Sequence, residues 1–236
     1  MRERPIIFTT EMVQAILDGR KTQTRRVIKP YPEIVTGDML SQYRWYAANH
    51  GDFCGDVERE LKPPYGYPGC LLYVRETWAR GCKEADPYCH CDTDELQKEN
   101  HYYVYKADTP DAKYPLDWDD ALAEDWVKDA DFVPRWKPSI HMPKSASRIW
   151  LRVKDVRVER VQDITESDAK NEGVRVDKLS PPQIIFNTTH AKFRYRYAFQ
   201  DLWDSINKKR GFGWESNPWV WVVSFEVISK TGRPGK

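Results

Sequence analysis

The sequence lacks a long hydrophobic run. Its longest apolar run, from Trp219 to Val223, is far shorter than the roughly 18 to 20 residues that a membrane-spanning helix needs. The first residues, MRERPIIF, also lack the apolar stretch and the small-residue cleavage site of a signal peptide. From these two absences we expect a protein of the cytoplasm with no membrane partner.

An excess of charge of one sign is also missing, because 37 Lys and Arg residues face 36 Asp and Glu residues. A protein that is drawn to nucleic acid by its overall field carries a clear positive excess. Any cationic surface must therefore be local, and the near-neutral total slightly favours a small nucleoside ligand over a long polyanion. The sequence identifies no protein partner.

Cysteines are few and odd in number, which argues against a disulfide framework. Free thiols or a metal site remain as alternatives. Soft ligands for a structural zinc ion are concentrated at Cys82, Cys89, His90 and Cys91, with Cys54, Cys70 or His101 as a further ligand. Their spacing is not the usual C-x-x-C pair, and nothing in the sequence requires a cofactor.

Cations are concentrated in one octet, GRKTQTRR, which spans residues 19–26 and holds four cations and two hydroxyls. It follows a short amphipathic segment that Thr10 can cap and in which Met12 and Ile16 lie one helical turn apart. Gly19 provides the helix end. The octet is therefore predicted to be a loop or strand directly after a helix.

Three further elements are predicted from periodicity. Residues 195–206 carry the apolar stripe of an amphipathic helix, and residues 219–227 alternate as a strand with two distinct faces. Residues 149–158 change parity near Lys154, which indicates a bulge. Thr165 can cap a brief helix that Gly173 ends. These elements predict an α+β fold, and we expect a small mixed barrel.

The remaining segments are less regular. Residues 31–69 are interrupted by Gly and Pro, so we expect turns with little regular structure. Residues 70–78, CLLYVRETW, read as a buried strand that carries Arg75 and Glu76 near its end. Residues 79–147 are acidic and aromatic without long periodicity. We therefore expect one domain over residues 1–236, with a long irregular insertion at about 79–147.

Several quoted stretches together carry a resemblance to a known family. They are ILDGRKTQTRR, YPGCLLYVRETW, WKPSIHMPKSASRIWLRV, ERVQDITESDAKNEGV and FQDLWDSINKKRGFGWESNPWVWVVSFEVI. In this combination the chain resembles the ASCH domain family, in the longer form common in bacteriophages and prophages. The resemblance implies a PUA-like mixed β-barrel with surrounding helices, a fold associated with RNA binding and modified-base recognition, although a fold does not by itself fix a function.

A compact branch of that family hydrolyses N4-acetylcytidine to cytidine and acetate. Motif by motif, the resemblance assigns its catalytic Lys, Thr and Glu to Lys21, Thr24 and Glu172. It implies an enzyme, an amidohydrolase that removes an acyl group from a modified cytidine-like base. This chain departs from the compact enzymes in its greater length and in the two arginines, Arg25 and Arg26, that follow Thr24.

The assigned residue types can perform that chemistry. A Thr hydroxyl needs a neighbouring base, and a neutral Lys can serve if burial and nearby cations lower its pKa. Glu172 would oppose that shift or would handle the proton of the leaving amine. Strict strand alternation places Lys21 and Thr24 on opposite faces, so their convergence requires a bend between them. We expect a pocket formed by the octet, the strand ending at Trp78 and the helix bearing Glu172.

Two other functions remain open. A non-catalytic reader of RNA or of modified bases would use cations to contact phosphate and Trp78 to stack a base. Its contacts would come from Arg20, Arg25, Arg26, Arg75 and Arg148, with Glu76 beside them. A ribonuclease would need the same cleft and a general base, for which His141 is the candidate. The structural alternatives are a solvated turn for the octet and core packing for Trp78.

Overall fold

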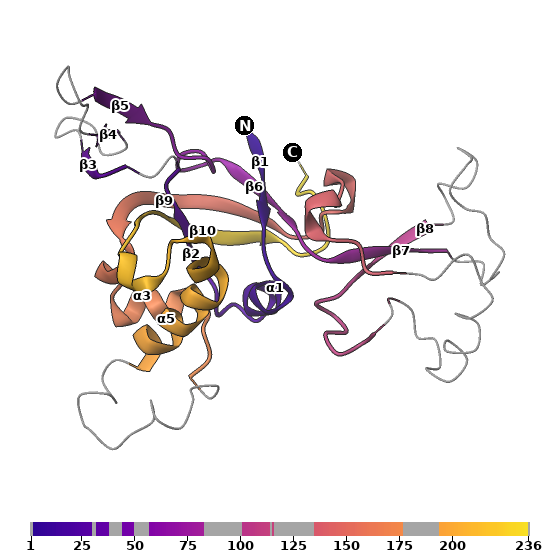
Figure 1. The fold of residues 1–236 in the computed structure, drawn as a ribbon. Coiled ribbons are helices and arrows are strands. Elements are labelled where there is room, and N and C mark those ends of the chain that lie inside the picture. The colour runs from indigo at the N-terminus through magenta and orange to yellow at the C-terminus, as the bar shows by residue number, and fades with distance from the viewer. Residues whose placement is uncertain are drawn as a thin grey trace.

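The structure is a computed structural model that describes residues 2–29, 32–37, 44–49, 57–82, 101–113, 115, 135–176 and 194–235. These residues form a mixed sheet with a small number of helices packed around it (Figure 1). The predicted α+β class is therefore confirmed. Among the described helices, none is long and apolar enough to cross a membrane.

The main sheet has five strands in the order β1-β6-β9-β10-β2. The strands are β1 (Glu3–Ile7), β2 (Gln23–Val27), β6 (Leu71–Arg75), β9 (Trp150–Arg160) and β10 (Trp219–Ser229). The pair β1–β6 is parallel and the other pairs are antiparallel. The described strands form an open sheet whose edges are β1 and β2, and not the closed barrel that we expected. A side chain links the two edges, because Arg26 Nη2 donates to Ile7 O at 2.8 Å.

The two faces of β10 pack into two separate cores. Trp221, Val223 and Phe225 belong to the larger core, which also receives the apolar face of α1 (Thr10–Leu17). The intervening Val220 and Val222 pack with α3 (Glu166–Asn171) and α5 (Arg194–Asn207). Because successive side chains of a strand point to opposite faces, one alternating apolar sequence stabilises both layers. The predicted strand and helix at this end of the chain are confirmed.

The local sequence signals for the bulge and for one helix cap are also confirmed. Opposite the bulge, Ser224 pairs with Asp155 and Phe225 pairs with Val153, so Lys154 is left without a cross-strand partner. Thr165 caps α3 as predicted, through a hydrogen bond to the backbone N of Asp168. The cap of α1 is Thr9, one residue before the predicted Thr10, because the Oγ1 of Thr9 accepts from the backbone N of Met12.

Residues 31–69 contain more regular structure than the sequence indicated. They include a three-stranded antiparallel sheet of β3 (Ile34–Gly37), β4 (Trp45–Asn49) and β5 (Val57–Leu61). Its strands have only four or five residues, which is too short for a clear alternation between the Gly and Pro interruptions. Trp45 joins this sheet to the main core by an edge-on contact with Trp221, at 5.1 Å between ring centroids.

The predicted strand over residues 70–78 is two strands. β6 ends at Arg75, and Trp78 begins β7 (Trp78–Cys82), which pairs with β8 (His101–Tyr105) in a separate ribbon. Figure 1 shows this ribbon projecting from the end of the main sheet. It lies within the expected insertion, much of which falls outside the described residues. Short 3-10 helices are η2 (Ser139–His141), η3 (Lys144–Ala146), η4 (Val161–Asp163), η6 (Lys208–Arg210) and η7 (Trp214–Ser216).

Candidate functional site

The cationic octet lies beside the end of α3. Gly19, with a φ of 74°, turns the chain after α1, and the backbone N atoms of Arg20 and Lys21 both donate to Ala15 O. Lys21 then forms an isolated antiparallel bridge with Glu172, the C-cap residue of α3. Two segments that are about 150 residues apart in the sequence are thereby brought together.

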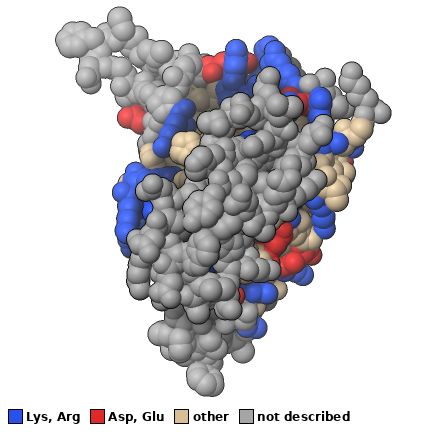
Figure 2. Space-filling model, turned by 90° about the vertical axis from the view of Figure 1, so that its right-hand side faces the viewer, with Lys and Arg blue, Asp and Glu red and all other residues tan. Residues whose placement is uncertain are grey.

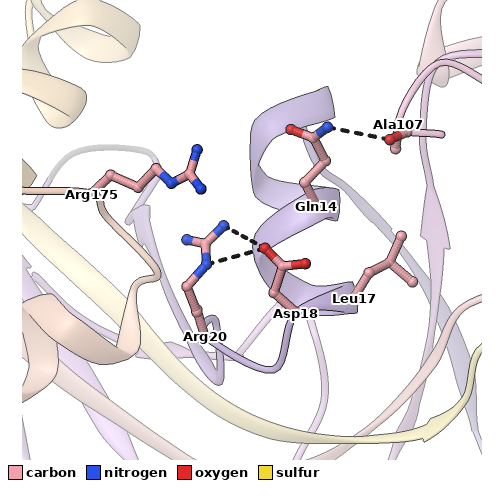
Figure 3. Close-up of a pocket in the computed structure, with 6 residues that line it drawn as sticks. All are labelled: Gln14, Leu17, Asp18, Arg20, Ala107 and Arg175. Atoms are coloured by element: carbon pink, nitrogen blue, oxygen red, sulfur yellow. Dashed lines mark hydrogen bonds and ion pairs between the residues drawn. The ribbon is translucent and has the colours of Figure 1, made fainter. Parts of the chain in front are cut away.

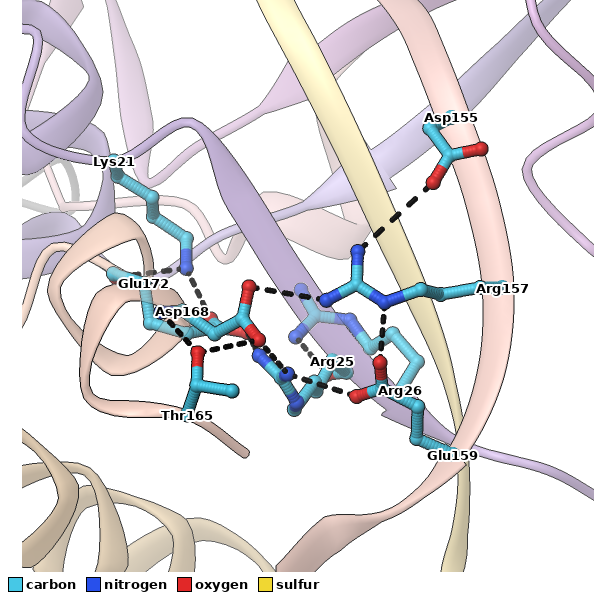
Figure 4. A network of polar contacts seen from close by, with 9 residues as sticks. All are labelled: Lys21, Arg25, Arg26, Asp155, Arg157, Glu159, Thr165, Asp168 and Glu172. Carbon is cyan, nitrogen blue, oxygen red and sulfur yellow. Dashed lines mark hydrogen bonds and ion pairs between the residues drawn. The ribbon is translucent and has the colours of Figure 1, made fainter. Parts of the chain in front are cut away.

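The side chains of Lys21 and Glu172 form a buried ion pair (Figure 4). Lys21 Nζ lies 2.7 Å from Glu172 Oε2 and also donates to Glu172 O at 3.0 Å. The side chains are 0% and 3% exposed. A charge pair with so little solvent is stable only when hydrogen bonds satisfy both partners, and here the second carboxylate oxygen of Glu172 accepts from Arg25 Nη1 at 3.2 Å.

Glycine is required beside this pair. Gly173 has a φ of 80°, and a Cβ at this position would lie 2.8 Å from Lys21 Cβ and 2.9 Å from Ala15 Cβ. A larger residue would therefore push the Lys21 backbone away from α3. The Gly that the sequence predicts as a helix end thus also permits the close approach of two chain segments.

Burial lowers the pKa of the Lys21 ammonium, because desolvation disfavours its charged form. The carboxylate of Glu172 opposes the shift, while Arg26 and Arg25 add to it. The net direction is downward, which is the direction that a lysine acting as a base requires. The opposing contributions agree with those expected from the sequence, which left the net sign open.

Thr24 lies on the same face of the sheet as the larger core. It pairs directly with Val223 across the β10–β2 ladder, and directly opposed residues share a face. Its Oγ1 is buried and has no hydrogen-bond partner among the described residues. Such a group costs free energy, so its presence is the kind of exception that marks functional sites.

The amine of Lys21 also lies near this face. Lys21 Nζ is 5.7 Å from the ring centroid of Phe8, and Phe8 packs in the larger core. Arg26, two residues after Thr24, places its guanidinium 5.3 Å from the same ring. Lys21 can reach this side because β2 begins at Gln23, after the bridge to Glu172, and the alternation of the strand does not extend back to residue 21.

Arg25 points to the opposite face, where it is surrounded by acidic side chains. Its Nη2 lies 3.0 Å from Glu159 Oε2 and 3.5 Å from Asp168 Oδ2, in addition to the contact with Glu172. Burial alone would raise the pKa of Asp168, but the hydrogen bond from Thr165 and nearby arginines outweigh it and lower that pKa. In this conformation Arg25 holds the acidic groups in place rather than offering its donors to a ligand.

The other predicted cationic contacts form a second polar group, near β7. Arg148 makes a bidentate pair with Glu76, at 3.1 Å for each N–O contact, and its Nη1 lies 2.8 Å from Asp108 Oδ2. Desolvation raises the pKa of the Glu76 carboxyl, against the hydrogen bond and charge of Arg148. Arg75 donates to two backbone carbonyls, Met142 O at 2.8 Å and Ile140 O. These donors are occupied within the protein.

Trp78 is packed inside the protein rather than exposed at a binding face. It is 6% exposed and contacts Tyr103 edge-on at 5.6 Å between centroids. The ammonium of Lys137 lies 5.4 Å from the centroid of the Trp78 ring. The arrangement agrees with core packing, the structural alternative for this residue. His141, the candidate base of a ribonuclease, is exposed at the end of η2.

Sequence reasoning missed Phe8, which lies between the two polar groups. Its backbone N donates to Arg75 O at 3.2 Å, while its ring lies under the cations of Lys21 and Arg26. The acidic partners Glu159 and Asp168 were missed as well. A signal existed for Glu159, since it alternates with Arg157 on one face of β9, but a local pattern does not reveal that Arg25 packs against that face.

A pocket that the described residues form lies elsewhere than the predicted one. It lies at the C-terminal end of α1, has a volume of about 230 Å³ and is shown in Figure 3. Its lining is Gln14, Leu17, Asp18, Arg20, Ala107 and Arg175. Of the predicted site residues only Arg20 lines it. Lys21, Thr24 and Glu172 are buried and do not line it, and Trp78 packs elsewhere, in a small core with Met142 and Ala146.

The described residues contain no group of three or more His, Cys, Asp or Glu side chains that could hold a metal ion. Cys89, His90 and Cys91 lie outside the described residues, as does Cys54, and the side chain of Cys82 is not described. Cys70 is a free thiol. The structural zinc therefore stays a prediction.

Comparison with known proteins adds little to this geometry. No protein-family model matches the chain, and no curated protein sequence matches it. One solved structure is similar over the whole chain and over 86% of its own length, with 10% sequence identity and a TM-score of 0.38. It is the crystal structure of protein EF3133 from Enterococcus faecalis V583, with the family designation DUF984.

Proposed function

We propose that the protein is an amidohydrolase of the PUA-like ASCH type, which removes an acyl group from a modified cytidine-like base. One observation carries the proposal: a buried lysine amine whose pKa is lowered and a buried threonine hydroxyl that lacks a hydrogen-bond partner among the described residues lie three positions apart in one segment. An amine that can lose its proton and a hydroxyl free to give one are the two components of a Ser-Lys-type nucleophile.

Each residue has a distinct role in the proposed reaction. Thr24 Oγ1 attacks the acyl carbonyl carbon while its proton passes to the neutral amine of Lys21. The bond between the acyl carbon and the base nitrogen then breaks, and Lys21 returns the proton to the leaving amine. Water hydrolyses the resulting Thr24 ester, which releases the carboxylic acid and restores the hydroxyl.

The surrounding charges support those steps. Glu172 Oε2, at 2.7 Å from Lys21 Nζ, stabilises the ammonium that forms after proton transfer. Arg26 lies on the same face of β2 as Thr24 and supplies positive charge for the oxyanion. Because Lys21, Thr24 and Glu172 are enclosed in this conformation, a substrate must displace covering side chains before it reaches them.

The test is release of cytidine from N4-acetylcytidine by the purified full-length protein, followed by chromatography. Loss of a general base or of its nucleophile lowers such rates by about 100-fold or more, so Lys21→Met and Thr24→Val should both abolish measurable turnover. Thr22→Val is the matched control. Thr22 is exposed and lies two residues before Thr24, so its substitution should leave turnover unchanged.

Two results would contradict the hydrolase. One is the absence of turnover across a panel of acylated nucleosides under conditions where the protein is folded. The other is equal turnover by Thr24→Val and the wild-type protein.

The alternative is a non-catalytic reader of RNA or of modified bases, or a ribonuclease. Figure 2 shows both basic and acidic side chains among the described residues at the rim of the face that it presents. The guanidinium groups of Arg25, Arg75 and Arg148 are also engaged by carboxylates or backbone carbonyls of the protein itself. These observations favour a small ligand over a long polyanion. Binding of a modified nucleoside without turnover would support the reader instead.

A further inference from the structure

The pocket at the end of α1 contains more positive than negative charge. Arg20 and Arg175 contribute two guanidinium groups to its lining, and Asp18 contributes one carboxylate (Figure 3). The remaining lining comes from an amide, an apolar side chain and an alanine. The lining therefore has one net positive charge at neutral pH.

Arg20 is held in position and still has donors to offer. Its Nε and Nη2 lie 3.2 and 2.8 Å from Asp18 Oδ2, and its Nη1 donates to Gly173 O at 2.7 Å. A guanidinium carries five N–H donors, so two of them remain after these three bonds. The carboxylate of Asp18 is neutralised by the same contact, which leaves the charge of Arg175 uncompensated within the pocket.

Arg175 is the free cation of this site. It is exposed and makes no hydrogen bond or ion pair with another residue in the part of the chain that the structure describes. Two guanidinium groups that line one small pocket repel each other unless an anion lies between them. The arrangement therefore favours a negatively charged ligand.

Acceptors that would favour a cationic ligand are already used. The last carbonyls of α1 would give this end of the helix a partial negative charge. However, Gln14 O accepts from Asp18 N, Ala15 O from Arg20 N and Lys21 N, Ile16 O from Gly19 N, and Leu17 O from Lys230 Nζ. The groups left to bind a ligand are therefore mainly the N–H donors of the two arginines.

We propose that this pocket binds a phosphate group, carried by a mononucleotide or by an RNA chain. Arginine pairs with the oxygens of phosphate in bidentate geometry. A volume of about 230 Å³ is ample for a phosphate group together with some water. The pocket adjoins the buried Lys21–Glu172 pair through the hydrogen bond from Arg20 to Gly173 O. Phosphate binding here does not require that the protein hydrolyse an acylated base.

Calorimetric titration of the full-length protein tests the proposal. The ligands are inorganic phosphate, CMP, cytidine, and a short oligoribonucleotide with and without a 5′ phosphate. We expect tighter binding of CMP than of cytidine. Arg175→Gln should weaken CMP binding about tenfold or more, because it removes charged hydrogen bonds, and Arg175→Lys should weaken it less. Arg152→Gln is the matched control, since Arg152 is a half-exposed arginine on β9 that is paired with Glu226.

The ligand series separates the two sources of phosphate. Tighter binding of CMP than of either oligoribonucleotide indicates a mononucleotide. Tighter binding of the oligoribonucleotides, with an affinity that falls steeply with salt, indicates RNA. Lys21→Met should retain CMP binding even if no acylated nucleoside is hydrolysed, so failure of the hydrolase and failure of this site are distinguishable.

Three results would overturn the site. They are the absence of binding by every phosphate compound at millimolar concentration, equal affinity of Arg175→Gln and wild type for CMP, and an equal loss of affinity in Arg152→Gln. Because the Arg175 side chain is exposed, both of its variants should retain the wild-type thermal midpoint. If Arg175→Gln fails to fold, the affinity of Arg175→Lys for CMP, compared with that of the wild type, tests the site instead.

Discussion

The buried, unpaired hydroxyl of Thr24 lowers the free energy of unfolding of the protein. An unsatisfied buried polar group costs about 1 to 3 kcal/mol, and replacing it by an apolar group of the same shape removes that cost. We expect Thr24→Val to raise the free energy of unfolding by roughly 1 kcal/mol while it abolishes turnover. Urea denaturation measures the first effect and cytidine release the second.

Thr22→Val again provides the control for Thr24→Val, because an exposed substitution should change stability by no more than about 0.5 kcal/mol. A loss of more than about 1 kcal/mol in Thr24→Val would indicate that the hydroxyl is hydrogen-bonded in solution, and would contradict an unpaired nucleophile at Thr24.

Glu172 sets the protonation of Lys21, and the sign of its effect can be measured. Its carboxylate raises the pKa of the lysine against the larger effect of burial. Since the proposed base is the neutral amine, activity should rise with pH through that pKa. Glu172→Gln removes the opposing charge, lowers the pKa of Lys21 further and should shift the rising limb of the pH–rate profile to lower pH.

A purely structural ion pair predicts a different outcome for Glu172→Gln. It would change stability, and with it the total amount of active protein, without moving the midpoint of the pH–rate profile. A limb that stays in place, or that moves to higher pH, would exclude Lys21 as the base.

At the scale of elements, the contact between α1, β2 and α3 depends on the absence of a side chain at Gly173. Gly173→Ala places a Cβ 2.8 Å from Lys21 Cβ in a backbone conformation with positive φ. The backbone conformation alone costs about 1 to 2 kcal/mol, and the displacement of Lys21 adds to that cost. We expect a lower free energy of unfolding together with loss of turnover.

Gly211→Ala is the matched control for Gly173→Ala. Gly211 has nearly the same φ, 82° against 80°, but nothing lies within 4 Å of a Cβ added there. The two substitutions therefore share the backbone cost, and their difference measures the clash with Lys21 and Ala15. Equal destabilisation by both would show that the contact between the elements tolerates a Cβ.

At the scale of the whole molecule, a network of charges joins β2, β9 and α3. Arg25 and Arg157 lie between Glu159 and Asp168, and Glu172 completes the group. Figure 4 shows these side chains converging from the three elements. Residues that are distant in sequence thus share one electrostatic environment, and the stability of the assembly must depend on pH.

Asp168 allows the direction of that dependence to be predicted. Its pKa is lower in the folded protein than in the unfolded chain, so its contribution to stability is fully present above the unfolded pKa of about 3.9. The contribution is lost as the pH falls through the folded pKa. Asp168→Asn should therefore destabilise the protein at pH 7, and the difference from wild type should shrink towards acid pH.

Thermal unfolding at several pH values measures this effect of Asp168. Asp111→Asn provides the control, because Asp111 is exposed in a turn and should change stability little at any pH. A difference between Asp168→Asn and wild type that stays constant from pH 7 to pH 3 would show that the ion pairs of Asp168 do not stabilise the fold.

The sequence by itself determined the local structure and the residue types of the candidate site. The stripe of α5, the two faces of β10, the bulge at Lys154 and the ends at Gly19 and Gly173 all follow from patterns over a few residues. Such patterns are readable because periodicity and φ preferences depend on near neighbours. The α+β class follows from the order of these elements.

Only the tertiary structure decided which charged side chains are paired and where a cavity lies. It paired Arg148 with Glu76, enclosed Arg25 among three carboxylates and left Arg175 beside Arg20 at a pocket. It also replaced the expected closed barrel by an open sheet whose edges a side chain links. Coulomb energies and desolvation depend on distances between groups that can be 150 residues apart, and no local pattern in a sequence contains those distances.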